Sequence, residues 1–314
     1  MAHARRAAAP VVTAVMAAAV ARTGYAALTR TPPGGKDRWN RTNHRGERVT
    51  LLEGPAAALA GAAGACLAAG VPGRSRAALA AAAAGAAAFG GYDDLAGSGG
   101  RRGFRGHLGA LARGQVTTGA VKIGGIGVTG VAAAALTGGP AVDVAINAAL
   151  VAGSANLLNL FDLRPGRALK VALVTGVPLG LSRRGTAAAA PVGAAVGMLP
   201  EDLGERAMLG DAGANALGAM LAAAAAGSLS RPARLAVLAG VTALTAASEV
   251  VSFTAVIQRT PPLHWLDMLG RRPAHAAPPA RATPGDPPVP GTRITPDSEV
   301  TPGPSAVPAA PHTP

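Results

Sequence analysis

Apolar stretches of near-spanning length alternate with short polar segments along most of this chain. We expect nine helical spans, at about residues 7–28, 51–71, 77–92, 117–137, 141–161, 168–182, 186–200, 212–228 and 233–257. A bilayer needs about 20 apolar residues per helix, with about 17 as the usual lower limit, so the shorter ranges are marginal. The alternative is a soluble alanine-rich bundle, whose helices would show a polar face every 3.6 residues, and residues 77–89 have none. The pattern therefore predicts an all-α, polytopic transmembrane bundle.

The two ends of the chain differ from this pattern. From about Arg272 the sequence is Pro-rich and polar, so we expect a membrane domain at 1–271 and a disordered cytoplasmic tail at 272–314. Residues 1–21 also resemble a signal peptide, with Arg5 and Arg6 before an apolar run and small residues at Ala19 and Ala21. We favour a retained first span over cleavage.

Composition supports the membrane assignment. Hydrophobic residues make up 49% of the chain and charged residues only 14%, whereas a soluble protein has roughly 25% charged residues. The net charge of +13 does not point to nucleic acid, because aromatic residues, which stack on bases, are only 3%. Most Lys and Arg residues lie in the segments 29–50, 93–116, 162–167, 201–211 and beyond 257. Basic loops are retained on the cytoplasmic side, so we expect a multi-pass plasma-membrane protein with these segments in the cytoplasm.

Cys66 is the one cysteine, so no intrachain disulfide can form. It lies in an alanine-rich apolar run, and we expect a buried, inert thiol.

Two polar motifs stand where apolar spans end. Asp93 and Asp94 are adjacent acids after the third range, and neighbouring carboxylates repel unless a cation or proton lies between them. They indicate a metal site, an acid/base pair or a solvated helix end. Asn156 and Asn159 share a helix face with Asp162 close by, which predicts either a functional polar site or hydrogen bonding between helices.

Four further polar residues stand near predicted cytoplasmic ends. Asp211 precedes a helix of small residues and fits an N-cap or a site acid. Lys122 begins one span, Glu249 lies inside another, and His264 follows the last. A single histidine is weak evidence for a metal site.

The order of these motifs resembles the polyprenyl-phosphate phospho-sugar transferases, a membrane family that acts in bacterial envelope synthesis. Residues 93–97 (DDLAG) are similar to the family's D-D-x-x-G, and residues 156–162 (NLLNLFD) to its N-x-x-N-x-x-D. Residues 209–218 (LGDAGANALG) are similar to M-G-D-x-G-S-x-x-L-G, with Ala214 in place of Ser. Residues 249–252 and 262–270 resemble the segments that follow, so the likeness covers residues 41–270.

The resemblance implies a Mg²⁺-dependent enzyme that moves phospho-sugar from a UDP-sugar to a polyprenyl phosphate and releases UMP, in cell-wall biogenesis. Asp93 and Asp94 would be catalytic, beside the carrier phosphate. Substrate would be bound by Lys122, Asn156, Asn159 and His264, and the metal by Asp162 and Asp211. The sequence leaves open whether the protein forms a homodimer.

This chain also departs from the family pattern. The family continues after Asp162 with a second acid, and Pro165, which has no ligating side chain, stands in its place. The histidine cluster is reduced to His264, and Arg164 and Arg167 add positive charge. The alternative is therefore a catalytically degenerate homologue that binds a lipid-linked or nucleotide sugar, or a partner enzyme.

Overall fold

A computed structural model describes residues 2–97, 106, 109–182 and 185–273 of this chain. The chain divides into two units, Met1–Arg272 and Pro273–Pro314, and every helix and strand given below belongs to the first. The predicted tail lies, from residue 274 onward, outside the described residues.

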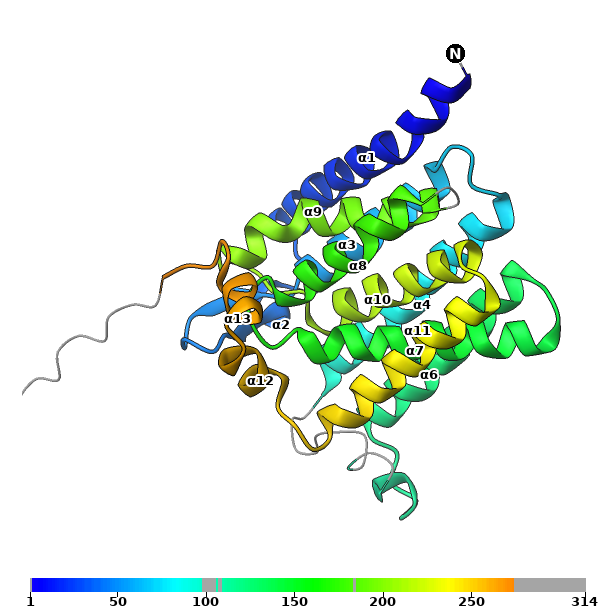
Figure 1. Ribbon diagram of the computed structural model, residues 1–314. Helices are drawn as coiled ribbons and strands as arrows, with labels where there is room; N and C mark the ends of the chain where they lie inside the picture. The colour runs from blue at the N-terminus through cyan, green and yellow to red at the C-terminus, as the bar shows by residue number, and fades with distance from the viewer. Residues whose placement is uncertain (1, 98–105, 107–108, 183–184, 274–314) are drawn as a thin grey trace, which may run out of the picture. The chain divides into compact units, whose positions relative to one another are not determined.

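The described residues are mostly helical, with a single short hairpin among them (Figure 1). Along the chain the elements are α1 (Ala2–Arg30), α2 (Lys36–Trp39), β1 (Asn40–Thr42), β2 (Arg48–Thr50), α3 (Glu53–Leu67), α4 (Gly73–Ala96), α6 (Thr118–Thr137), α7 (Ala141–Phe161), α8 (Arg167–Leu181), the short 3₁₀ helix η1 (Gly185–Ala188), α9 (Ala189–Leu203), α10 (Gly210–Ser228), α11 (Arg231–Ser248), α12 (Phe253–Arg259) and α13 (Pro261–Met268). Each range expected from the sequence coincides largely with helix, so the all-α prediction is confirmed at this level.

Three of these helices are long and apolar enough to cross a membrane: residues Ala8–Arg30 of α1, α6 and α7. The bent pair α11 and α12 adds a fourth if it counts as one broken span. These numbers apply to the part of the chain that the structure describes. They are consistent with a membrane protein, and the count of nine spans stays a prediction.

The expected single helix over residues 233–257 is wrong. The chain bends by 97° between α11 and α12, and exposed Glu249 lies at this break rather than inside a span. Ser252 begins the new helix, because its side chain accepts a hydrogen bond from the backbone N–H of Ala255 (3.4 Å). Serine at this position satisfies a backbone donor that the helix itself leaves unpaired.

Small side chains let the helices approach closely around α10, which packs against α3, α4 and α7. An added Cβ on Gly213 of α10 would lie 2.7 Å from the Cα of Gly54 in α3, and one on Gly218 would lie 2.4 Å from the carbonyl oxygen of Ser154 in α7. Contacts of this kind are typical of helices that pack in lipid. Alanine and glycine thus supply the packing that aromatic residues supply in other cores.

Ion pairs and hydrogen bonds join the start of α7 to the start of α11. The Asp143 carboxylate accepts hydrogen bonds from Arg231 (2.8 and 2.7 Å) and Arg234 (2.9 Å), and Arg234 also donates to Asn147 (2.6 Å). This cluster lies one α7 length away from Asp162, which follows the other end of the helix.

Cys66 is exposed, so the expectation of a buried thiol is wrong. It stands in the last turn of α3 on the side away from the core, whereas its neighbour Ala65 is fully buried.

Candidate functional site

The carboxylate of Asp94 joins the end of α4 to the start of α10. Its two oxygens accept hydrogen bonds from the backbone N–H groups of Asp211 (3.0 Å) and Ala212 (2.9 Å). The first N–H groups of a helix lack partners within it and carry partial positive charge, which favours a carboxylate there. Asp94 therefore caps α10. The alternative interpretation of Asp211 as the N-cap is wrong, because Leu209 holds that position and makes no side-chain cap.

Two glycines permit this close approach. A Cβ on Gly90 would lie 2.3 Å from the carbonyl oxygen of Asp211. Gly210 has φ +59°, and its Cβ would lie 2.9 Å from a carboxylate oxygen of Asp94. A side chain at either position would separate α4 from α10.

Lys122 of α6 lies between two of the predicted acids. Its Nζ is 2.9 Å from Asp93 Oδ2 and 2.5 Å from Asp211 Oδ2. The three side chains expose between 16% and 22% of their surface, so water screens these charges only partly. The resemblance implies that Lys122 binds substrate, and in the structure its partners are carboxylates of the first and third motifs.

Asp162, the acid of the second motif, also lies at the start of α10. It follows α7 directly and accepts a hydrogen bond from the backbone N–H of Gly210, the first residue of α10. The ends of α4 and α7 and the starts of α6 and α10 thus meet, and the four acids Asp93, Asp94, Asp162 and Asp211 lie around this junction.

Asp202 is a fifth acid of the junction that the sequence analysis missed. It lies buried near the end of α9 and accepts a hydrogen bond from the backbone N–H of Gly166. Glu201 and Asp202 are adjacent acids directly after a predicted span, as Asp93 and Asp94 are, and this repeated pattern is the signal that could have found them.

Burial and mutual repulsion raise the pKa of most of these carboxyl groups. Burial, together with the charge of Asp211, raises the pKa of Asp94 to about 7, although backbone donors oppose the shift. Burial and repulsion from Asp202, Asp211 and Asp94 raise the pKa of Asp162 well above its ordinary value. Burial raises the pKa of Asp202 to about 7.

Lys122 contacts both Asp93 and Asp211, yet the pKa values of these two acids shift in opposite directions. Burial favours a higher pKa for Asp93, but hydrogen bonds from Lys122 and Thr118 outweigh it, and the pKa is lowered. For Asp211 burial outweighs the charge and hydrogen bond of Lys122, and its pKa is raised. The junction thus contains more carboxyl groups than Lys122 can pair with, and the raised pKa values of the others favour their protonated forms.

The carboxylate oxygens of the junction are chemically suited to bind Mg²⁺, but the protein supplies few such ligands. Carboxylate oxygens are the donors that Mg²⁺ prefers, and a cation would relieve the repulsion around Asp162. Among the described residues, however, no three His, Cys, Asp or Glu side chains are arranged to hold a metal ion. Mg²⁺ commonly binds through one or two carboxylates and substrate phosphates, so Asp162 and Asp211 would suffice only together with phosphate.

The remaining predicted residues are not brought into direct contact with the acids. Asn156 and Asn159 lie half-buried on α7, and neither side chain makes a hydrogen bond to another described residue. His264 lies exposed on α13, and no hydrogen bond or ion pair with a described residue links its side chain to the junction.

A polar cavity of about 190 Å³ adjoins the junction. Asp162 and Asp202 form part of its wall, with Pro165 and Arg164 from the loop before α8 and His44 from the hairpin. In the described part of the chain Arg164 makes no ion pair, because its one hydrogen bond goes to the neighbouring carbonyl of Leu163. The cavity therefore offers a cation that is not neutralised by an acid.

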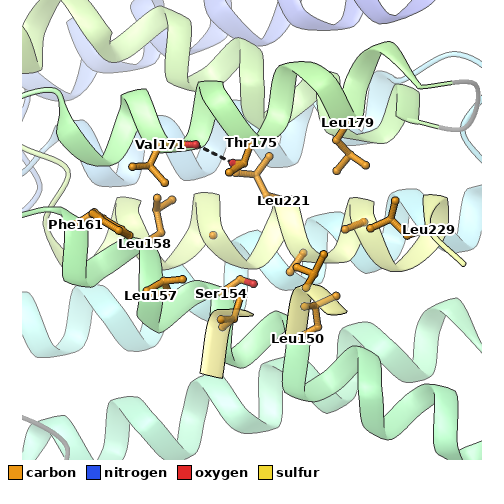
Figure 2. Close-up of a pocket in the computed structure, with 15 residues that line it drawn as sticks. Leu150, Ser154, Leu157, Leu158, Phe161, Val171, Thr175, Leu179, Leu221 and Leu229 are labelled. Carbon is orange, nitrogen blue, oxygen red and sulfur yellow. Dashed lines mark hydrogen bonds between the residues drawn. The ribbon is translucent and has the colours of Figure 1, made fainter. Parts of the chain in front are cut away.

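An apolar groove of about 330 Å³ lies between α7, α8, α10 and α11 (Figure 2). Aliphatic side chains, among them Leu150, Leu158, Leu179 and Leu221, form most of its lining. Phe161, which precedes Asp162, lines the groove and stacks on Phe253 of α12 with ring centroids 4.8 Å apart. The groove thus reaches the helix end that carries Asp162.

No family model matches this sequence, and no curated protein matches it. The likeness to the phospho-sugar transferases therefore rests on the motifs themselves.

Proposed function

We propose that this protein is an integral plasma-membrane enzyme that transfers phospho-sugar from a UDP-sugar to a polyprenyl phosphate in cell-envelope glycan synthesis. The observation that carries the proposal is the meeting of Asp93, Asp94, Asp162 and Asp211 at the start of α10, where Lys122 pairs with Asp93 and Asp211, although these residues are far apart along the chain. The proposed topology has about nine spans and a cytoplasmic active face.

The surroundings of the junction support two substrates of different chemistry. An apolar groove of more than about 300 Å³ suits a lipid chain, and the groove beside Phe161 is lined by aliphatic side chains. The polar cavity beside Asp162 contains Arg164, and its volume of about 190 Å³ suits the charged phosphates of a nucleotide, with the rest of the ligand outside it. Asp162 lines the cavity and its neighbour Phe161 lines the groove, so the two phosphates would meet near Asp162.

The residues of the junction suit phosphoryl transfer. In the proposed reaction an oxygen of the carrier phosphate attacks the sugar-linked phosphorus, and the bond to the departing UMP breaks. Asp94, with a pKa of about 7, can accept a proton from the carrier phosphate near neutral pH. Lys122 can transfer its contact from a carboxylate to a phosphate oxygen as a compact point charge. Mg²⁺, when bound at Asp162 and Asp211, supplies neutralisation of phosphate charge.

A second candidate function is binding of the same ligands without turnover. Pro165 in place of the family's second acid favours it, since the cavity wall then has one carboxylate fewer for a metal. Arg164 beside Pro165 adds charge that holds phosphate without activating it.

A transfer assay separates the two functions. Membranes containing the protein are incubated with radiolabelled UDP-GlcNAc and undecaprenyl phosphate, with Mg²⁺ or with EDTA, and the labelled lipid is measured. We expect a Mg²⁺-dependent product that is lost in Asp94→Asn and retained in the matched variant Asp143→Asn, which changes an acid at the other end of α7. Binding of several UDP-sugars without any lipid product would establish the second function instead.

A further inference from the structure

The segment Asp267–Arg272, here named the strap, begins in the last turn of α13 and is held at its first end by buried charges. Asp267 accepts hydrogen bonds from Arg167 (2.7 and 3.1 Å) and Arg271 (3.0 Å). The side chains of Arg167 and Asp267 are only 4% and 5% exposed. Separating such a pair leaves a buried charge without a partner, so this end of the strap is firmly fixed.

The other end of the strap is held by a weaker pair. Arg272 donates two hydrogen bonds to Glu47 of the hairpin (2.8 and 3.1 Å). These side chains are 34% and 38% exposed, and ion pairs that water reaches contribute little to stability. Gly270, between the two ends, has φ +74°, which glycine adopts without strain. The Arg272 end of the strap should therefore detach from the hairpin first, with Gly270 as the position where the backbone rotates.

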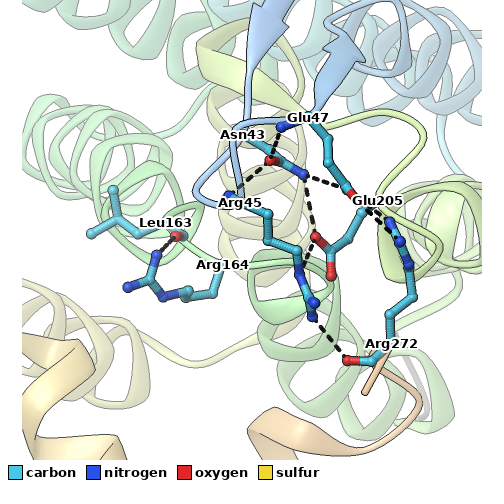
Figure 3. Close-up of polar contacts among 7 residues, drawn as sticks. All are labelled: Asn43, Arg45, Glu47, Leu163, Arg164, Glu205 and Arg272. Atoms are coloured by element: carbon cyan, nitrogen blue, oxygen red, sulfur yellow. Dashed lines mark hydrogen bonds and ion pairs between the residues drawn. The ribbon is translucent and has the colours of Figure 1, made fainter. Parts of the chain in front are cut away.

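The weak end is connected to the wall of the polar cavity (Figure 3). Arg45 donates to the carbonyl oxygen of Arg272 (3.0 Å) and pairs with Glu205 (2.9 Å). Asn43 donates to Glu47 and to Glu205, at 3.2 Å each. Asn43 and Glu205 line the cavity, whereas Glu47 and Arg272 do not. One network thus holds both the strap and the hairpin side of the cavity.

We propose that Glu47 and Arg272 form a latch that controls access to the polar cavity. While they are paired, the turn of the hairpin stays closed against the cavity, and separation of the pair loosens the turn and lets an occupant enter and leave. The strand β2 stays in place, because Thr50 accepts a backbone hydrogen bond from Met208 (3.0 Å). Only the identity of that occupant, a UDP-sugar, rests on the proposed function. Because the latch does not line the cavity, it should change the entry and exit rates by the same factor.

The first test measures access to the cavity without any nucleotide. Val49 lines the cavity and is 3% exposed, so Val49→Cys in a Cys66→Ser chain reports entry of the neutral reagent methyl methanethiosulfonate. We expect Glu47→Arg and Arg272→Glu each to speed modification by about two- to fivefold, the range for one exposed ion pair. The double exchange Glu47→Arg/Arg272→Glu should restore the original rate.

Asp37→Arg is the matched control, because Asp37 pairs with Arg48 near the hairpin but is 96% exposed, and no change is expected. Equal modification rates in all variants would overturn the latch. If Val49→Cys does not fold, the latch can be tested by amide hydrogen exchange of residues 40–50 in the other variants. Exchange should be faster in Glu47→Arg and Arg272→Glu, and equal rates would overturn the latch.

The second test uses fluorescently labelled UDP-GlcNAc and stopped-flow mixing. Opening the latch should raise the association and dissociation rates equally and leave the Kd unchanged. A faster dissociation alone would overturn the latch, because it would mean that the pair contacts the nucleotide. If UDP-GlcNAc does not bind the unmodified chain, the nucleotide assignment fails and thiol modification alone decides the latch.

Discussion

Asp94→Asn should make the protein more stable above neutral pH while it abolishes transfer. The substitution removes the charge of Asp94 and keeps the shape of the side chain at the start of α10. An acid whose pKa is raised by folding binds its proton more tightly in the folded chain than in the unfolded one. Stability is therefore highest below the unfolded pKa and falls as pH rises toward the folded pKa.

The magnitude follows from the pKa of about 7 in the folded chain. An unfolded Asp has a pKa of about 3.9, so the difference is about three units, each worth ~1.36 kcal/mol. The native chain should lose up to ~4 kcal/mol between about pH 4 and about pH 7, and the variant should lose none of it. Asn provides one acceptor where Asp94 uses two, and one lost hydrogen bond costs the variant ~1 kcal/mol at every pH.

We therefore expect Asp94→Asn to be less stable by ~1 kcal/mol near pH 4 and more stable by up to ~3 kcal/mol near pH 8. Both differences in stability can be measured as melting temperatures in detergent with EDTA. The fluorescence of Trp39 and Trp265 reports unfolding. Each kcal/mol should shift the midpoint by ~2 °C. The exposed acid Asp37 is the control, since Asp37→Asn should show no change of sign. A variant less stable than the native chain at both pH values would refute the reasoning.

Two further substitutions test the metal site and the far end of α7. Pro165→Asp should raise Mg²⁺ affinity, measured by calorimetry with UDP present, since it adds a carboxylate to the cavity wall beside Asp162; unchanged affinity would place the ion elsewhere. Asp143→Asn should lower the melting temperature, because Arg231 and Arg234 lose the negative charge and one of the two acceptor oxygens that they share, and should leave transfer intact. Loss of transfer in that folded variant would show that the acids at the junction are not specifically required.

The alternation of apolar and polar segments was sufficient to predict the long helices, but not the short helices α2, α12 and α13. The predicted segments at 117–137 and 141–161 differ from α6 and α7 by at most one residue, because Gly138, Gly139 and Pro140 interrupt the pattern between them. The break after Ser248 could not be predicted in this way. The bend carries no proline or glycine, and Ser252 becomes a helix cap only when the chain has turned.

The sequence also placed Asp93, Asp94, Asp162 and Asp211 at helix ends, because acids are costly inside an apolar span. Their order along the chain did not determine which of them caps a helix, which pairs with Lys122 and which stays without a cation. Tertiary packing decided these roles. Gly90 and Gly210 admit Asp94 to the first N–H groups of α10, and Asp211 then turns toward Lys122. Helix formation depends on neighbours in sequence, whereas the charge state and partner of each acid depend on groups that only folding brings near.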